Sequence, residues 1–431
     1  MRHILRVTLT FILWVWALGN PLVGSSLASA ATDQDIWTLR LAGGYEVFTN
    51  AFSLAENDTT ETIAEATFTT SVMGRSGRGS RHRWLLSAES SLGTELIRER
   101  IDGDFRWCDE SGAPRLRFSC SGRARQYRQE TVYGLSSDSG EGRMDLRGYP
   151  VAGGDYSLET RAWTSGLYYQ VPSTLELDQR EKGGSLVMRH GQPTGANWSM
   201  GAHFARRTYP DSTGLDRNTT GCEGSWEGSR LRIYQRSDRR AVKDEETRSP
   251  AWNHWTDLDL ELPFSSGAVF LELQDEIWKY DLVQGAFPDY LRTSARLGYD
   301  WGDLLAVRWR VGLSGEIMRS DDDSESYDQY GVLAGVESYG LDMSGSLLVE
   351  SGWRRYRGQD GEFDAADGTW SDYSGTGFTD FNYWKIWLTG GWNLTPRLAL
   401  DLLASYEPER HGEKSDDTTL GFASVRLVWR P

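Results

Sequence analysis

From residue 31 onward, hydrophobic side chains recur at every second position, and this alternation constrains the fold more than any other feature of the chain. In the segment 397–406, for example, Leu398, Leu400 and Leu402 alternate with polar residues such as Asp401. Successive side chains of a β-strand point to opposite faces, so a period of two predicts strands with one apolar and one polar face. No long segment has the 3.6-residue period of an amphipathic helix. The pattern therefore predicts an all-β protein.

The alternation also marks where the strands lie. Clear spans occur at 252–263, 267–279, 290–299, 303–317, 328–338, 343–356, 381–392, 397–406 and 418–430, and earlier ones at 35–48, 62–73, 82–98, 124–136 and 229–236. Between residues 143 and 208 the alternation is weaker and accommodates two to four more spans. We predict about 16 strands, within a range of roughly 14–18, which lies inside the size range of membrane barrels.

The connections between these spans alternate in length. Short, turn-like junctions at 265–267, 300–303, 340–342 and 393–397 are interleaved with long polar ones at 280–289, 318–327, 357–380 and 407–417. Short turns at one end and long loops at the other are typical of a membrane β-barrel with both termini at the short-turn end. With that orientation, residues 209–228 become a long connection at the short-turn end, which indicates a missed span there.

Aromatic residues are abundant, with 19 Trp, 19 Tyr and 14 Phe, and their spacing favours a membrane barrel over a soluble sandwich. Trp384 and Trp392 share one face of a predicted strand, eight residues apart. At a rise of about 3.3 Å per residue they are separated by roughly 26 Å, close to the ~25 Å between the two aromatic girdles of a membrane barrel. We assign Trp309, Trp353 and Trp429 to the same girdles.

These features together resemble the bacterial outer-membrane β-barrel (porin-like) proteins over nearly all of residues 35–430. The last span, with Ala423, Val425, Leu427 and Trp429 on one face, is similar to the family's C-terminal assembly signal, although Arg430 and Pro431 follow the aromatic residue. The resemblance implies a transmembrane, antiparallel up-and-down β-barrel in the cell outer membrane. It also implies contact with the barrel assembly machinery, outer-membrane lipid and lipopolysaccharide, and leaves open a homotrimer or an envelope complex partner.

The first 30 residues have the features of a secretory signal peptide. Arg2 and Arg6 precede an apolar segment over 7–18, and Ala28-Ser29-Ala30 matches the small-residue cleavage pattern. The predicted organisation is a signal peptide at 1–30 and one barrel domain at 31–431. Because exported proteins meet an oxidising environment, a disulfide between Cys108 and Cys120 is plausible across the polar stretch that separates them.

Composition excludes other classes of protein. The formal net charge of -16 argues against a nucleic-acid partner, and a mean hydropathy of -0.53 argues against a bundle of membrane helices. The aromatic content argues against a disordered acidic chain.

If the apolar faces meet lipid, the alternate positions line the interior. They form a predicted basic wall of Arg230, Arg232, Arg292, Arg296, Arg308 and Arg310, and a predicted acidic wall of Asp257, Asp259, Glu261, Glu272 and Glu276. Two interpretations stand: separate charged walls that act on solutes in an open pore, or opposite charges that pair across strands and rigidify or block the interior.

The function that fits best is a channel for passive diffusion of small hydrophilic solutes. A non-conducting barrel that serves as a scaffold or sleeve for an envelope or electron-transfer complex is the first alternative. An outer-membrane barrel hydrolase is the second, for which His254 is the histidine to test. The sequence contains no nucleophile-elbow motif and no haem or zinc motif. We therefore expect no enzyme activity, no cofactor and no metal site.

Overall fold

A computed structural model describes most of the chain after residue 35. The described residues are 36–54, 57–75, 82–93, 96–127, 138–152, 155–170, 177–191, 196–244, 249–281, 288–303, 306–322, 325–357, 363–364, 369–370, 380–411 and 417–429. The predicted signal peptide lies outside them.

Long antiparallel strands make up nearly all of the described structure. They are β1 (Ile36–Leu54), β2 (Asn57–Arg75), β3 (His82–Gly93), β4 (Leu96–Cys108), β5 (Pro114–Tyr127), β6 (Ser139–Val151), β7 (Tyr156–Tyr169), β8 (Gln179–His190), β9 (Asn197–Thr208), β10 (Arg217–Glu227), β11 (Leu231–Val242), β12 (Ala251–Phe264), β13 (Gly267–Tyr280), β14 (Tyr290–Asp303), β15 (Val307–Ser320), β16 (Tyr327–Tyr339), β17 (Met343–Tyr356), β20 (Phe381–Thr395), β21 (Leu398–His411) and β22 (Thr418–Trp429). A separate two-stranded ribbon, β18 (Phe363–Asp364) and β19 (Thr369–Trp370), lies in the connection between β17 and β20.

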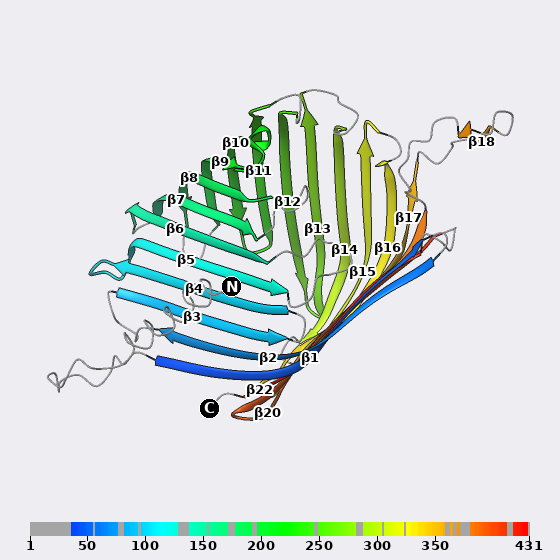
Figure 1. Cartoon of the computed structure of the whole chain (residues 1–431), viewed down its shortest axis with the longest axis horizontal. Coiled ribbons are helices and arrows are strands. Elements are labelled where there is room, and N and C mark those ends of the chain that lie inside the picture. The colour runs from blue at the N-terminus through cyan, green and yellow to red at the C-terminus, as the bar shows by residue number, and fades with distance from the viewer. Residues whose placement is uncertain are drawn as a thin grey trace.

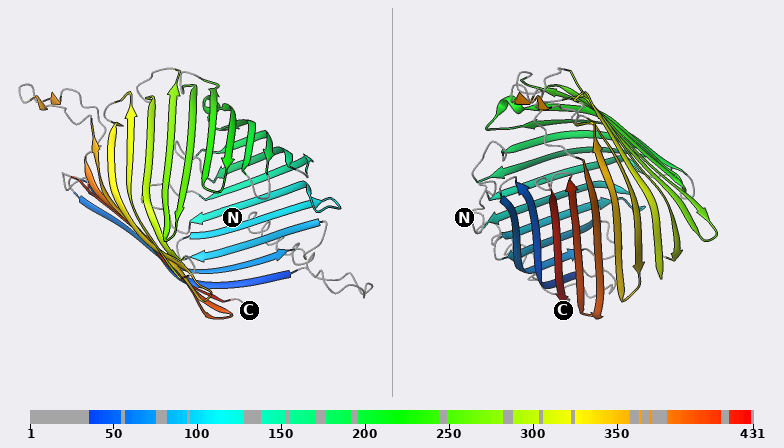
Figure 2. Two further views of the ribbon diagram at one scale, coloured as in Figure 1. Left: turned by 180° about the vertical axis from the view of Figure 1, so that it is seen from behind. Right: turned by 90° about the vertical axis from the view of Figure 1, so that its right-hand side faces the viewer.

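The long strands form one closed barrel. Each strand pairs antiparallel with the next in sequence, β17 pairs directly with β20, and β22 returns to pair with β1 (Figures 1 and 2). The closing seam runs through the pair Gly44–Arg426. Closure gives every long strand a hydrogen-bonded neighbour on both sides. Residues 57–66 of β2 extend beyond β3, and residues 36–40 of β1 extend beyond β22.

A 3-10 turn, η1 (Thr213–Leu215), lies in the connection between β9 and β10. None of the described helical structure is long and apolar enough to cross a membrane.

Connections of different length gather at the two ends of the barrel, as predicted. The start of β1, the end of β22 and tight turns such as 265–266 and 396–397 lie at one end, which we call the turn end. Longer connections such as 281–289 and 357–380 lie at the other, the loop end. The up-and-down topology is therefore confirmed.

The barrel has 20 strands, so the prediction of about 16 was wrong. The missed spans are β4 and β10, and the span predicted at 124–136 was misplaced, because it overlaps β5 only over residues 124–127. On β4, Glu99 and Gly103 interrupt the apolar face. The predicted span at 82–98 therefore joins β3 to the first residues of β4. On β10, the corresponding face holds Thr220, Cys222 and Gly224, which are too small or polar to show the alternation. β10 also removes the unexplained long connection at 209–228.

The expected disulfide between Cys108 and Cys120 is absent, and both cysteines are free. Cys120 lies opposite Gly103 in the β4–β5 ladder, five residues along β4 from Cys108. At about 3.3 Å per residue this separates the two sites by roughly 16 Å, and a disulfide needs Cα atoms within about 7 Å. The register of the hairpin, which the sequence did not reveal, therefore excludes the bond.

Candidate functional site

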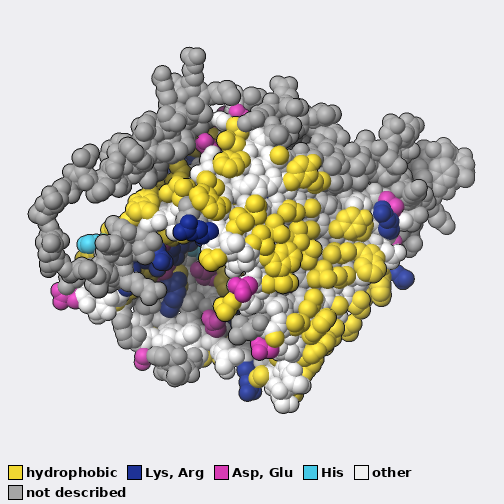
Figure 3. Space-filling model, turned by 90° about the horizontal axis from the view of Figure 1, so that it is seen from below, with side chains coloured by type: hydrophobic (Ala, Val, Ile, Leu, Met, Phe, Trp, Pro, Cys, Tyr) yellow, Lys and Arg dark blue, Asp and Glu magenta, His cyan; other side chains and the backbone are white. Residues whose placement is uncertain are grey.

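The two faces of the barrel wall differ in chemistry, as β15 illustrates. Trp309, Val311 and Leu313 are exposed on one face, and Arg308 and Arg310 lie on the other, where they form ion pairs with neighbouring strands. Seen from below the view of Figure 1, hydrophobic side chains cover much of the outer wall and charged side chains gather in the hollow (Figure 3). The apolar face is therefore the exterior, and the charged face lines the interior.

Except for Arg230, the side chains predicted as a basic and an acidic wall lie on the interior face, but they do not form separate walls. Arg296 and Arg310 both approach Glu272, at 3.7 Å and 3.8 Å between nitrogen and oxygen, and Arg232 pairs with Asp259 across β11 and β12. The register places Glu276 opposite Arg292 on β14. Asp257 and Glu261 share the interior face of β12, and Arg230 lies in the turn before β11. Opposite charges are thus interleaved, as the second interpretation expected.

Further carboxylates, which the sequence analysis did not select, complete this region. Asp300 is buried and accepts hydrogen bonds from Arg308 and Arg310, with Arg310 Nε at 2.8 Å. Glu350, also buried, accepts hydrogen bonds from the Tyr383 hydroxyl and from Ser314, both at 3.0 Å. These buried carboxylates anchor the wall from β14 to β20.

Tyr383 reaches across the glycines of the neighbouring strands. An added Cβ on Gly331 or Gly352 would lie 2.7 Å or 2.8 Å from its hydroxyl, so glycine at both positions makes room for the ring. Gln329 donates a hydrogen bond to the same hydroxyl at 3.1 Å, and Tyr383 is only 1% exposed. This packing and hydrogen bonding of Tyr383, which we call the Tyr383 interlock, holds β20 against β16 and β17.

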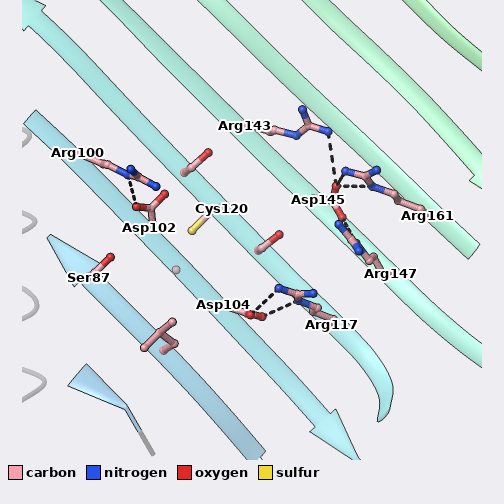
Figure 4. Close-up of a pocket in the computed structure, with 14 residues that line it drawn as sticks. Ser87, Arg100, Asp102, Asp104, Arg117, Cys120, Arg143, Asp145, Arg147 and Arg161 are labelled. Carbon is pink, nitrogen blue, oxygen red and sulfur yellow. Dashed lines mark hydrogen bonds and ion pairs between the residues drawn. The ribbon is translucent and has the colours of Figure 1, made fainter. Parts of the chain in front are cut away.

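A second region of the interior wall, from β3 to β7, is rich in arginine. A cavity of about 460 Å³ is lined there by five arginines and three aspartates: Arg100, Arg117, Arg143, Arg147, Arg161, Asp102, Asp104 and Asp145. Asp145, whose side chain is 5% exposed, is the centre of the cluster: Arg161 pairs with it, Arg147 lies at 2.9 Å and Arg143 at 3.8 Å (Figure 4). Three cations thus surround one carboxylate.

A neighbouring cavity of about 360 Å³ continues this surface from β6 to β11. Its lining holds six arginines against three carboxylates: Arg143, Arg161, Arg207, Arg217, Arg236, Arg240, Glu181, Glu223 and Asp238. Arg207 binds Glu181 at 2.6 Å and Arg236 binds Asp238 at 2.8 Å. Because Arg143 and Arg161 line both cavities, we call the two linings together the arginine wall.

The comparisons with known proteins concern the fold. The copper transporter OprC aligns over 94% of this chain and 81% of its own length, at 10% sequence identity and a TM-score of 0.56. Acinetobacter baumannii OccAB4 aligns over 93% of this chain and 98% of its own length, at 10% identity and a TM-score of 0.47. The siderophore receptor PirA from Pseudomonas aeruginosa aligns over 90% of this chain and 80% of its own length, at 11% identity and a TM-score of 0.49. No protein-family model and no curated protein matches the chain.

The chain has a closed antiparallel β-barrel fold, which it shares with the copper transporter OprC. A closed barrel whose exterior is apolar and whose interior is charged satisfies the requirements of a lipid bilayer. The protein is therefore placed in the outer membrane, and the turn end corresponds to the periplasmic side.

The arginine wall of this barrel is not among the sites predicted from the sequence. Its strands have weak apolar faces, so hydrophobic alternation marks them poorly. A signal was nevertheless present, because arginines at every second or fourth position, such as Arg115 and Arg117 or Arg143 and Arg147, mark one face of a strand.

The tryptophans predicted for the girdles lie at two levels. Trp353 and Trp384 are exposed near the loop end, Trp309 and Trp429 are exposed near the turn end, and Trp392 is half-buried near the turn end. The two levels fit the two interfaces of a bilayer, and the girdle assignment remains a prediction that measured lipid contacts can test.

His254 lies on the exterior face of β12. Its Nδ1 lies 2.6 Å from the Ser237 hydroxyl and its Nε2 lies 3.1 Å from the Thr256 hydroxyl. The third member of this group is therefore a hydroxyl, whereas hydrolytic triads normally use a carboxylate or amide to orient the histidine. Among the described residues, no group of three or more histidine, cysteine, aspartate or glutamate side chains is placed to hold a metal ion.

Proposed function

We propose that this outer-membrane barrel is a passive channel for small hydrophilic solutes and that its interior favours anions. The barrel has more strands than the 16–18 that already leave an aqueous channel in porins. The observation that carries the anion preference is the excess of arginines over carboxylates in the arginine wall.

The charge distribution suggests how the preference would arise. Asp257 and Glu261 on β12 add negative charge to the interior beside the arginine wall, and Asp259 on the same strand is paired with Arg232. A solute between the two regions experiences a transverse field, and its anionic groups are drawn toward the arginines. No bond is made or broken in such a passage, so the proposal assigns no catalytic residue.

Planar-bilayer recording of purified, refolded protein tests the channel. We expect single-channel steps and, across a potassium chloride gradient, a reversal potential that indicates chloride permeating faster than potassium. An absence of steps would refute the channel and favour the sleeve, for which a partner that co-purifies after mild detergent extraction is the expected finding. Release of fatty acid from phospholipid, lost in Ser237→Ala and His254→Ala, would instead support the hydrolase.

A further inference from the structure

Several cations on the exterior face near the loop end are paired with carboxylates. Arg239 binds Asp281, with one nitrogen–oxygen distance of 2.6 Å, and Arg410 lies 3.3 Å from Asp417. Arg319 likewise pairs with Asp328. Each of these arginines therefore carries its own counter-charge.

Three cations on β8 and β9 differ from this pattern. Arg180, Lys182 and Arg206 are exposed, and they share strand faces with the exposed hydrophobic residues Leu186 and Phe204. They therefore point to the outside of the barrel. We call them the β8–β9 cation cluster.

Their exterior neighbours supply no negative charge. The residues directly opposite in the ladders are Thr164 beside Lys182, Thr208 beside Arg180 and Asn218 beside Arg206. Among the described residues, none of the three cations has a carboxylate within 4 Å. The cluster is thus not neutralised by the described part of the wall.

The register brings the cations close together. Lys182 lies directly opposite Arg206, where Cβ atoms are about 4.5–5.5 Å apart, and Arg180 is two residues away from Lys182 on the same face. Like charges placed directly opposite each other destabilise a sheet. The arrangement becomes favourable when an anion lies between the cations, because a phosphate accepts several charge-assisted hydrogen bonds.

The level of the cluster matches the membrane interface. Lys182 is three residues from the loop-end start of β8, roughly 10 Å along the strand. The guanidinium of Arg180 lies 5.7 Å from the ring centre of Tyr168, an exposed aromatic residue at the loop end of β7. Exposed apolar side chains, Leu186 and Phe204, continue from the cluster toward the turn end. Cations at the interface with an apolar surface beside them fit an amphiphile with an anionic head and acyl chains.

We propose that the β8–β9 cation cluster binds the phosphate groups of the outer leaflet's anionic glycolipid, lipopolysaccharide. The phosphates lie between Lys182 and Arg206, Arg180 adds a third positive charge, and the acyl chains lie along Leu186 and Phe204. A soluble phosphate provides the same head chemistry but cannot use the apolar surface. The proposal concerns the exterior wall and does not depend on the channel.

The test compares the protein with the triple variant Arg180→Gln, Lys182→Gln, Arg206→Gln in detergent micelles, with bis-phosphorylated lipid A as the probe and binding followed by calorimetry. We expect the variant to bind lipid A at least tenfold more weakly. Arg410→Gln, which removes an exterior arginine that has its own carboxylate, is the matched control and should bind as the unmodified protein does. Heat-modifiable migration in gels shows that each variant is folded.

Two further probes separate the sources of phosphate. Dephosphorylated lipid A should bind the unmodified protein as weakly as the triple variant binds lipid A, and inorganic phosphate should not compete at equal concentration. Equal binding of lipid A by the triple variant would overturn the proposal. Full competition by inorganic phosphate would overturn the assignment to a lipid.

Discussion

Removing the charge of Arg143 is the most informative single change to the arginine wall. Arg143 lines both cavities, and its side chain is 42% exposed, so solutes can reach it. Its contact with Asp145 is long, at 3.8 Å, and Asp145 keeps Arg147 and Arg161 as closer partners. Arg143→Gln therefore removes an accessible positive charge without leaving a buried carboxylate unpaired.

The size of the effect follows from Coulomb's law. An anion about 5 Å from the guanidinium gains roughly 0.8 kcal/mol in a water-filled interior. Screening over half a Debye length at 0.1 M salt reduces this to about 0.5 kcal/mol. At room temperature that corresponds to roughly a twofold change in local anion occupancy. At 1 M salt the Debye length falls to about 3 Å and most of the effect disappears.

Reversal potentials in planar bilayers measure this change. We expect Arg143→Gln to lower the chloride-to-potassium permeability ratio at least about twofold at 0.1 M salt, because chloride occupancy falls while potassium occupancy rises, and much less at 1 M. Arg206→Gln is the matched control, because it removes the same charge from the exterior face, and it should leave the ratio nearly unchanged. An equal fall in both variants, or an effect that does not depend on salt, would refute the reasoning.

The remaining predictions concern stability and the cysteines. Tyr383→Phe removes the hydroxyl that donates to Glu350 and should lower the free energy of unfolding in urea by about 1–3 kcal/mol; an unchanged midpoint would contradict the interlock. Without reductant, the unfolded protein should react with three equivalents of maleimide, whereas a Cys108–Cys120 disulfide would leave one. Hydrogen bonds from Ser111, Ala113 and Arg115 lower the pKa of Asp109, in the turn after β4, to about 2 from its ordinary 3.8. A lowered folded-state pKa means that this carboxylate stabilises the turn above pH 3.8 and loses that contribution as the pH falls toward 2. After correction for the intrinsic exchange rate, hydrogen exchange of the Ala113 amide should accordingly speed up as the pH falls from 3.8 to 2. In Asp109→Asn the corrected rate should not change over the same interval.

The alternation of side chains was sufficient to predict the fold class and the two faces of the strands. Between residues 251 and 429 it also predicted all nine long strands, because there the exterior face is largely apolar, as on β15 with Trp309, Val311 and Leu313. The period of two is a local property of the backbone and needs no knowledge of neighbouring strands. Over the same residues, short turns and long loops likewise revealed the direction of each strand.

The strand number and the arrangement of interior charges required the tertiary structure. β4 and β10 form because their neighbours pair with them on both sides, although Glu99 on β4 and Cys222 on β10 weaken the apolar pattern. Whether Arg296 faces a carboxylate depends on the register between β13 and β14 and on which strands are adjacent. Pairing between strands is non-local, so the sequence determined which residues face inward. Only the closed barrel decided which charges pair, where arginines are in excess, and which exterior cations have no carboxylate beside them among the described residues.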